Sequence, residues 1–187
     1  MASHGKFYEL AKRGDLWILN TAAAGVVIPA EDTTAPTFGV LNGAGSGVDL
    51  VLQRLAAGFV DTTGAAGTFY HMIKSGAPAT PATGTVVSAM TEGEPVNAYF
   101  GAGNSKPDLV QCFPATATIS AAGTLLEAVG ISETVVTAAD ATNLYSKFVD
   151  DIEGRIVIPP GCIYYVCGSA SMLSKLNLSL MFEVVAA

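Results

Sequence analysis

Residues 154–187 read GRIVIPPGCIYYVCGSASMLSKLNLSLMFEVVAA, and the final apolar run of this stretch decides the fold. From 175 to 182, leucine or phenylalanine occupies every second position, and lysine, asparagine, serine or methionine occupies the positions between them. A period of two is typical of a β-strand that has one buried face and one face toward water. The sequence therefore predicts that the chain closes with a half-buried strand.

Two turn signals precede this strand, at Pro159-Pro160-Gly161 and at residues 168–171. Proline has a fixed φ and glycine readily adopts a positive φ, so neither residue extends a strand ladder easily. We expect the chain to turn sharply at 159–161, run back through 162–167, and turn again into the last strand. This predicts a meander that closes a jelly-roll-like sandwich, with Cys162 and Cys167 on opposite faces of their strand because their spacing is odd.

Short apolar, β-branched or aromatic runs separated by Gly, Pro, Thr, Asn and Asp continue back to Leu16. About ten to twelve such runs at intervals of about a dozen residues favour an all-β fold, a jelly-roll-like antiparallel β-sandwich. The longest run, 48–60, is expected to be broken by a bulge at Ala56-Ala57-Gly58. The predicted sandwich spans residues 16–187 as a single domain.

Residues 1–15 form a separate N-terminal arm in this interpretation. The stretch KFYELAKRGD is compatible with a short helix that ends at Gly14 and equally with an extended strap over a neighbouring subunit. The tripeptide Arg13-Gly14-Asp15 resembles an integrin-binding motif, but a turn at the end of the arm explains it more simply.

The composition is unusually poor in charge. Of the 187 residues, 50% are hydrophobic and only 13% are charged, whereas soluble domains carry about 25% charged residues. No apolar run reaches the roughly 18 residues of a spanning helix, and the N-terminus has no signal-peptide pattern. We expect the protein to be made in the cytoplasm and not to associate with a membrane. Apolar surface would then be covered by companion subunits, in a homo-oligomer and by our interpretation a trimer. The alternative is an Ala/Gly-rich monomer.

The charge pattern also limits the partners. The net charge is −7 and the nine basic residues are scattered, so nucleic acid is not expected as a direct partner. An odd number of cysteines without a signal peptide favours free thiols in a reducing compartment.

No arrangement of residues predicts catalysis, a cofactor or a metal. The glycines at 43, 45 and 47 follow G-x-G-x-G and lack the spacing of a dinucleotide loop, so a turn between strands is favoured. Neither the two histidines nor the three cysteines have zinc-ligand spacing. A triad would need His71, yet the chain has no G-x-S-x-G elbow, so a structural hydrogen-bonding role is favoured. The acidic residues Asp150, Asp151 and Glu153 are interpreted as a solvated turn rather than a cation site.

Several stretches are similar to virion proteins of small tailed bacteriophages. The start, GKFYELAKRGDLWILNTAAAGVVIP, resembles their opening of Tyr-Glu, a basic pair, Gly, a polar residue and Leu. The run TFGVLNGAGSGVDLVLQRLAAGFV resembles their strand, Asn, Gly-rich turn and following strand. Pro159-Pro160-Gly161 and a last strand with an acidic residue complete the likeness, which covers about the first sixty and the last thirty residues.

The resemblance implies a structural protein of a phage particle with a jelly-roll-like fold and no catalytic residues. We expect a capsid decoration or cement protein that stabilises the shell, with the major capsid protein or neighbouring virion proteins as partners. The expected contacts lie in residues 1–15 and in the loop SGAPATPATG, through Phe7, Tyr8, Lys12, Arg13, Pro78 and Pro81. One alternative is a tail or fibre component that binds host glycans, using aromatic residues such as Tyr70, Tyr99, Phe100, Tyr164 and Tyr165. A β-sandwich hydrolase is a further alternative.

Overall fold

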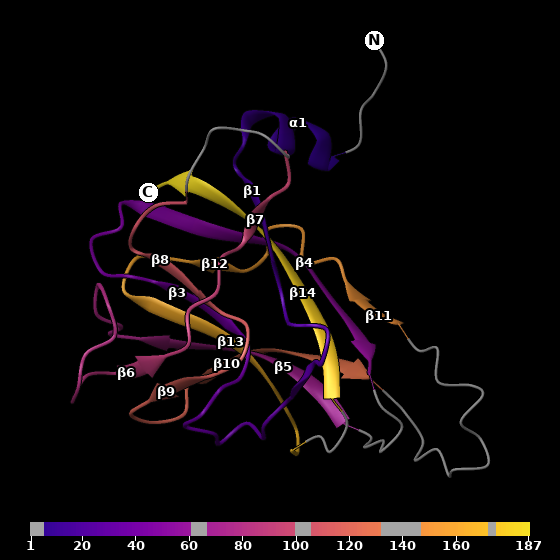
Figure 1. The fold of residues 1–187 in the computed structure, drawn as a ribbon, viewed down its shortest axis with the longest axis vertical. Helices are drawn as coiled ribbons and strands as arrows, with labels where there is room; N and C mark the ends of the chain where they lie inside the picture. Colours follow the sequence, from indigo (N-terminus) through magenta and orange to yellow (C-terminus); the bar gives the residue numbers. More distant parts are fainter. Residues whose placement is uncertain (1–5, 61–66, 100–105, 132–146, 172–174) are drawn as a thin grey trace.

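The regular secondary structure of the described residues is almost all β-strand, with one helix at the N-terminal end (Figure 1). The structure, a computed structural model, describes residues 6–60, 67–99, 106–131, 147–171 and 175–187. The first sheet has the order β11-β4-β14-β1-β7, and its strands are β11 (Lys147–Asp150), β4 (Val48–Phe59), β14 (Lys175–Ala186), β1 (Leu16–Asn20) and β7 (Val96–Asn97). In the same sheet, β12 (Val157–Ile158) pairs with β4, and β2 (Val26–Val27) pairs with β14.

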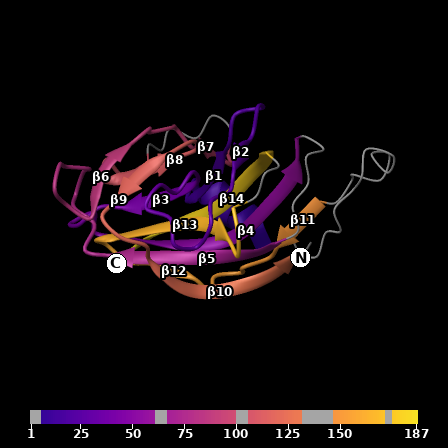
Figure 2. The same ribbon diagram turned by 90° about the horizontal axis from the view of Figure 1, so that it is seen from below.

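The second sheet has the order β10-β5-β13-β3-β8, and its strands run side by side when the molecule is seen from below (Figure 2). They are β10 (Thr124–Ile131), β5 (Gly67–Ser75), β13 (Cys162–Gly168), β3 (Gly39–Asn42) and β8 (Val110–Phe113). A small third sheet pairs β6 (Val87–Met90) with β9 (Ala117–Ile119). All pairings between these named strands are antiparallel.

The orders of the two large sheets match position by position along the chain. Corresponding positions in the two orders hold β11 and β10, β4 and β5, β14 and β13, β1 and β3, and β7 and β8. Each pair is successive in the chain, except that β2 lies between β1 and β3. The chain therefore crosses from one sheet to the other at each position. Alternation between two packed sheets is how a jelly roll is wound. The predicted all-β, jelly-roll-like sandwich is confirmed.

The predicted closing meander is wrong in its pairing. A meander would pair β13 with β14, but β13 pairs with β3 and β5 while β14 pairs with β1 and β4. The turns at 159–161 and 168–171 are therefore connections between sheets. The expected positive φ is present at Gly161, at 79°. Cys162 and Cys167 lie on opposite faces of β13, as predicted, and belong to different apolar clusters.

Strand β4, which with β14 is the longest of the described strands, contains a bulge at a different position from the predicted one. Met181 lies opposite Arg54 and Phe182 lies opposite Leu52, which leaves Gln53 as the extra residue. The pairing continues without interruption across residues 56–58. Because the bulge shifts the alternation by one residue, Leu52 and Leu55 both reach the core.

The core has two layers. The main apolar cluster lies between the large sheets and includes the side chains of β14 that the period-two pattern predicted: Leu176, Leu178, Leu180 and Phe182. A second cluster packs the small sheet against the outer face of the second sheet. Every residue of β13 is consequently buried. Most of the outward side chains of β14 are instead exposed or half-buried.

A buried amide closes one end of the sandwich. Asn42 Nδ2 donates 2.8 Å hydrogen bonds to the carbonyl oxygens of Val48 and Ile158, and its Oδ1 accepts one from the Ser46 hydroxyl at 2.6 Å. Val48 and Ile158 belong to the first sheet, whereas Asn42 belongs to the second. One side chain therefore ties the end of β3 to two strands of the opposite sheet.

Candidate functional site

The N-terminal arm contains a helix, α1 (Lys6–Arg13). Gly14 ends the helix with a φ of 78°, and its N–H donates to the carbonyl oxygen of Ala11 at 2.9 Å. Asp15 N–H donates to the carbonyl oxygen of Leu10 at 3.2 Å. A left-handed glycine at this position is a common helix stop. The predicted helix ending at Gly14 is confirmed, while residues 1–5 lie outside the described part of the chain.

Helix α1 is attached to its own sandwich by basic side chains. The Arg54 guanidinium lies 5.7 Å from the centre of the Phe7 ring. Arg13 forms 3.0 Å ion pairs with Glu183 of β14 and with Asp15. Phe7 is half-buried and Arg13 faces two carboxylates of its own chain. These two predicted contact residues therefore attach the helix to the sandwich, and the Arg-Gly-Asp tripeptide is part of that attachment.

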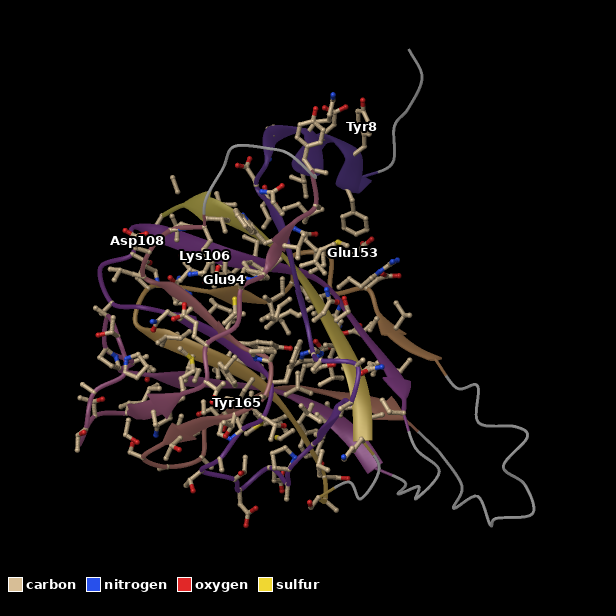
Figure 3. The ribbon with its side chains drawn as sticks, viewed as in Figure 1. Tyr8, Glu94, Lys106, Asp108, Glu153 and Tyr165 are labelled. Carbon is tan, nitrogen blue, oxygen red and sulfur yellow. The ribbon has the colours of Figure 1, made fainter. Side chains whose placement is uncertain are left out.

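Tyr8 and Lys12 form an exposed cluster with Tyr99. Lys12 Nζ lies 5.2 Å from the centre of the Tyr99 ring and 6.0 Å from that of Tyr8. Both tyrosines are 43% exposed. Val96, in the strand β7 that ends two residues before Tyr99, is 53% exposed. Tyr8 projects from the outer side of α1, away from the strands (Figure 3). We call Tyr8, Lys12, Val96 and Tyr99 the α1 patch.

Sequence reasoning picked two members of the α1 patch and missed their connection to the others. Tyr99 lies 87 positions beyond Lys12 in the numbering, and only the pairing of β7 with β1 brings it beside the helix. Tyr99 follows the short strand β7, but nothing in the neighbouring residues indicates that it lies beside the N-terminal helix.

The loop with Pro78 and Pro81 is a separate region. Pro78 and Pro81 are both half-buried, and the residues between them end in an exposed Thr80. The Pro78 carbonyl oxygen accepts a 3.4 Å hydrogen bond from Ala44 N–H, and Ala77 N–H donates to the Gly161 carbonyl oxygen at 2.8 Å. The loop is therefore supported by the turn between β3 and β4. The glycines of that turn include Gly45 and Gly47 with positive φ, as expected of a turn between two strands.

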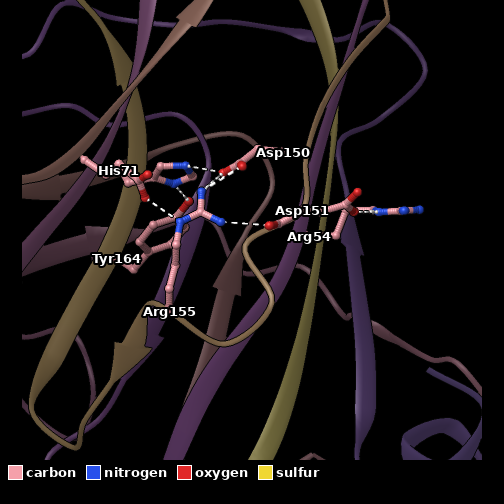
Figure 4. Close-up of polar contacts among 7 residues, drawn as sticks. Arg54, His71, Asp150, Asp151, Arg155 and Tyr164 are labelled. Atoms are coloured by element: carbon pink, nitrogen blue, oxygen red, sulfur yellow. Dashed lines mark hydrogen bonds and ion pairs between the residues drawn. The ribbon is translucent and has the colours of Figure 1, made fainter. Parts of the chain in front are cut away.

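A buried polar network occupies the edge of the sandwich (Figure 4). His71 Nδ1 lies 2.6 Å from the Tyr164 hydroxyl, and His71 Nε2 lies 3.0 Å from Asp150 Oδ2. Arg155 donates to both Asp150 oxygens, at 2.7 and 2.8 Å, and its Nε donates to Glu127 at 2.8 Å. These bonds tie strands β5, β13, β11 and β10 together at one edge.

The hydrogen bonds assign the protonation of His71. The ionised Asp150 carboxylate only accepts, so Nε2 carries the proton; Nδ1 then accepts from the Tyr164 hydroxyl. Burial lowers the pKa of His71 despite the hydrogen bond and charge of Asp150, which raise it. Burial also raises the pKa of Tyr164 well above its usual value. Both groups are therefore neutral at physiological pH.

The network resembles a catalytic relay in its residue types but not in its access. His71 and Tyr164 have no exposed surface, Asp150 is 11% exposed, and the Arg155–Glu127 end is the most open, with 37% of each side chain exposed. A groove of about 330 Å³ lies there, lined by Leu126, Glu127, Arg155, Ile156 and Val157. His71 is a buried hydrogen-bonding residue, and its structural role stays a prediction.

The predicted solvated turn is confirmed for Asp151 and Glu153, which are exposed, and is wrong for Asp150, whose side chain is only 11% exposed. Asp150 is bound by His71 and Arg155, and Asp151 forms a 2.6 Å ion pair with Arg54. The hydrogen bonds to Glu127 and Asp150 raise the pKa of Arg155 above its usual value. Within the described residues, no group of three His, Cys, Asp or Glu side chains could hold a metal ion. No described helix is long and apolar enough to span a membrane.

The remaining aromatic and sulfur-containing candidates are mostly buried. Tyr164 and Tyr165 have no exposed surface and Tyr70 is half-buried, so these do not form an open sugar-binding face; Phe100 lies outside the described residues. All three cysteines are buried and unpaired. Burial raises the pKa of the Cys112 and Cys167 thiols to about 12 and also raises that of Cys162.

Comparison with known proteins adds no relative to these observations. No protein-family model matches the sequence, and no curated protein or solved structure matches it significantly.

Proposed function

We propose that the chain is a structural protein of a phage particle, a decoration or cement protein that binds the assembled capsid and stabilises it. The α1 patch is the observation that carries this proposal. It presents two exposed tyrosine rings beside a lysine that has no carboxylate partner among the described residues, and Val96 of β7 is exposed as well. Tyrosine is enriched where protein interfaces concentrate their binding energy, because it buries a large rigid surface.

The rest of the surface suits an assembled subunit. Nine large apolar side chains of the described residues are exposed, and they lie on several strands as well as on α1. Charged residues make up only 13% of the chain, against about 25% in a typical soluble domain, and interface cores are likewise depleted in charged residues. We therefore include a homo-oligomer in the proposal, with a trimer as the specific prediction, and a virion location.

Shell stabilisation would follow from mass action. A protein that binds only the assembled shell stabilises it by RT ln(1 + [L]/Kd), about 2.7 kcal/mol when its free concentration is 100 times Kd. An oligomer that carries several copies of the α1 patch would bind more tightly than one copy, through effective concentration. The loop with Pro78 and Pro81 is the second proposed contact with the major capsid protein.

The experiment uses phage particles assembled without this protein. The purified chain is added, and bound protein is measured by sedimentation and shell melting by calorimetry. We expect saturable, stoichiometric binding and a raised shell melting temperature. Tyr8→Ala should weaken binding by about tenfold or more, equivalent to about 1.4 kcal/mol. Leu125→Ala is the matched control, because Leu125 is 45% exposed on β10, away from α1.

Electron microscopy of the labelled chain on intact particles separates the alternatives. Label on the head surface supports the proposal, and label confined to the tail contradicts it. Failure to bind shells, or equal loss of binding in Tyr8→Ala and Leu125→Ala, would also contradict it. A monomer at all concentrations in analytical ultracentrifugation would remove the homo-oligomer from the proposal.

A further inference from the structure

The outer face of the first sheet contains a groove of about 510 Å³. Its floor is made by β14 and β4, which run side by side (Figure 1), and one wall is the chain that leaves β1. The lining residues are all uncharged, and most of them are small: Asn20, Thr21, Ala23, Ala56, Ala57, Gly58, Asn177, Leu178 and Ser179. The volume is within the range of about 300–1,000 Å³ that is usual for small-molecule sites.

The strand register places polar side chains in adjacent rows across this floor. Asn20 lies opposite Ser179, and Ser179 lies opposite Ala56. In the next row, Asn177 lies opposite Gly58. Side chains directly opposite one another in antiparallel strands share a face and lie about 5 Å apart. The groove therefore has amide and hydroxyl groups on β1 and β14 and bare backbone on β4.

These polar groups have unused hydrogen-bonding capacity. Within the described residues, the Asn20 amide, the Asn177 Nδ2 and the Ser179 hydroxyl make no hydrogen bond to protein. Thr21 differs, because its hydroxyl accepts from Leu178 N–H at 3.0 Å and donates to Asn177 Oδ1 at 3.4 Å. The three open groups provide both donors and acceptors toward the groove.

Gly58 has no structural reason to be glycine within the described chain. Its φ lies outside the left-handed region, and a Cβ built on it would meet nothing within 4 Å. At Gly39, by contrast, a Cβ would collide with the backbone of Tyr164. Glycine inside a strand is unfavourable by itself, and it often marks a place where a ligand approaches the backbone. At position 58 the missing side chain keeps the groove open.

The chemistry of the groove selects the class of ligand. No lining residue is charged, so the site offers no ion pair to a phosphate or a carboxylate. At Ala56, β4 is paired with β14 on one side and with β11 on the other, so an added peptide strand would find no open edge. Sugar hydroxyls both donate and accept, and a sugar ring has apolar C–H faces that suit Ala23 and Ala56.

We propose that this groove binds a neutral sugar unit of a glycan. The Asn20, Asn177 and Ser179 side chains would bind the sugar hydroxyls, and the ring would lie over Ala56 and Gly58. The proposal is independent of shell binding, because the groove includes no residue of the α1 patch.

The test is an NMR titration of the full chain with methyl glycosides of glucose, galactose, mannose and N-acetylglucosamine. Glucose 6-phosphate serves as the charged comparison. We expect saturable shifts of the Ala56, Gly58 and Ser179 amides with at least one neutral sugar, and tighter binding of that sugar than of its charged counterpart. No saturable shift with any neutral sugar, or shifts confined to other strands, would overturn the proposal.

Gly58→Val separates binding from folding. Valine favours strands and has open space here, so the melting temperature should be equal or higher while sugar binding weakens at least tenfold. Ala128→Val, which adds bulk to an exposed position on β10 of the other sheet, should leave sugar binding unchanged. Retained binding in Gly58→Val would contradict the proposal. So would concentration-dependent broadening of groove amides without sugar, since this would mark an interface between copies.

The second variant removes hydrogen bonds without filling the groove. Asn20→Ala combined with Ser179→Ala deletes two side chains that have no protein partner within the described chain, so the fold should remain. Sugar affinity should fall at least tenfold, and an unchanged affinity would contradict the assigned roles. Both groove variants should still bind capsid shells. Loss of sugar binding can therefore be told apart from loss of the proposed shell binding.

Discussion

His71 shows how a single residue acquires a role from its surroundings. A histidine in an apolar run carries no local signal of its partners, and here the partners are a tyrosine from β13 and an aspartate from β11. The imidazole receives one hydrogen bond and donates another, so both ring nitrogens are satisfied while the ring stays neutral. Protonation would turn both nitrogens into donors and leave the buried Tyr164 hydroxyl without its acceptor.

The lowered pKa of His71 predicts acid sensitivity. In the unfolded chain His71 binds a proton below about pH 6.5, whereas burial keeps the folded imidazole neutral to lower pH. The unfolded state then binds more protons, so the free energy of unfolding should decrease as the pH falls from about 6.5 toward the lowered folded pKa. Urea denaturation across this range measures the effect.

His71→Gln is the matched variant, since glutamine can donate to Asp150 and accept from Tyr164 but does not titrate. It should be less stable than the parent at neutral pH and should lose part of the pH dependence. An identical pH dependence in both proteins would show that other groups cause it.

At the scale of elements, long-range polar contacts decide which edges close. Arg155 connects the turn after β11 to β10 through Asp150 and Glu127. Asn42 connects β3 to β4 and β12. Arg155 binds groups from both large sheets, and Asn42 of the second sheet binds two strands of the first, so each side chain limits how the sheets can slide over one another.

The two ion pairs at this edge should differ in their effect on stability. Arg155→Ala leaves the Asp150 carboxylate, which is 11% exposed, without its cation. We expect a loss of about 1–3 kcal/mol, moderated because Arg155 itself is partly exposed. Arg54→Ala, the control, breaks a pair whose side chains are 40% and 52% exposed and should cost about 0–1 kcal/mol. Equal losses in urea denaturation would contradict this ranking.

Loss of the Asn42 amide should be more damaging. Asn42→Ala removes the only side-chain donor to the Ile158 carbonyl among the described residues, and the shorter of two side-chain hydrogen bonds to the Val48 carbonyl. A buried polar group without a partner costs about 1–3 kcal/mol. We expect a total loss of about 2–4 kcal/mol by chemical denaturation. Ser46→Ala, which removes the 2.6 Å hydroxyl bond to Asn42 and two longer 3.4 Å bonds to the Val48 backbone, should cost about 1 kcal/mol. A neutral effect of Asn42→Ala would show that water replaces the amide.

At the scale of the whole molecule, burial in the core protects the three free cysteine thiols. Cys112 and Cys162 belong to the main apolar cluster and Cys167 belongs to the second. The reactivity of the three thiols therefore reports on opening of the sandwich. Near pH ~8.5, where an ordinary thiol is half-ionised, the folded protein should resist iodoacetamide because its thiols are buried and the pKa of two of them is about 12.

Mass spectrometry after denaturation in guanidinium should find all three cysteines alkylated. Modification of the folded protein at Cys162 before the other two would agree with its 8% exposure. Rapid modification of all three in the folded protein would contradict a closed core.

The sequence by itself determined what depends on neighbouring residues. The period-two pattern of 175–182 predicts which side chains of β14 are buried, and Gly14 and Gly161 mark where the chain stops and turns. Helix α1 and most strands follow from the same local rules. The predicted decoration role, in contrast, stays a proposal, because no local pattern specifies a partner.

Only the tertiary structure decided which strands pair and which distant side chains meet. The sequence suggested a meander at the end of the chain, but β13 and β14 belong to opposite sheets, since a turn sets direction without choosing a sheet. The bulge at Gln53, the His71 network, the Tyr99 side of the α1 patch and the open groove above Gly58 all depend on pairing between residues far apart in the chain. Such pairings are selected by burial of the whole core, and that selection leaves no signal in the residues on either side of each position.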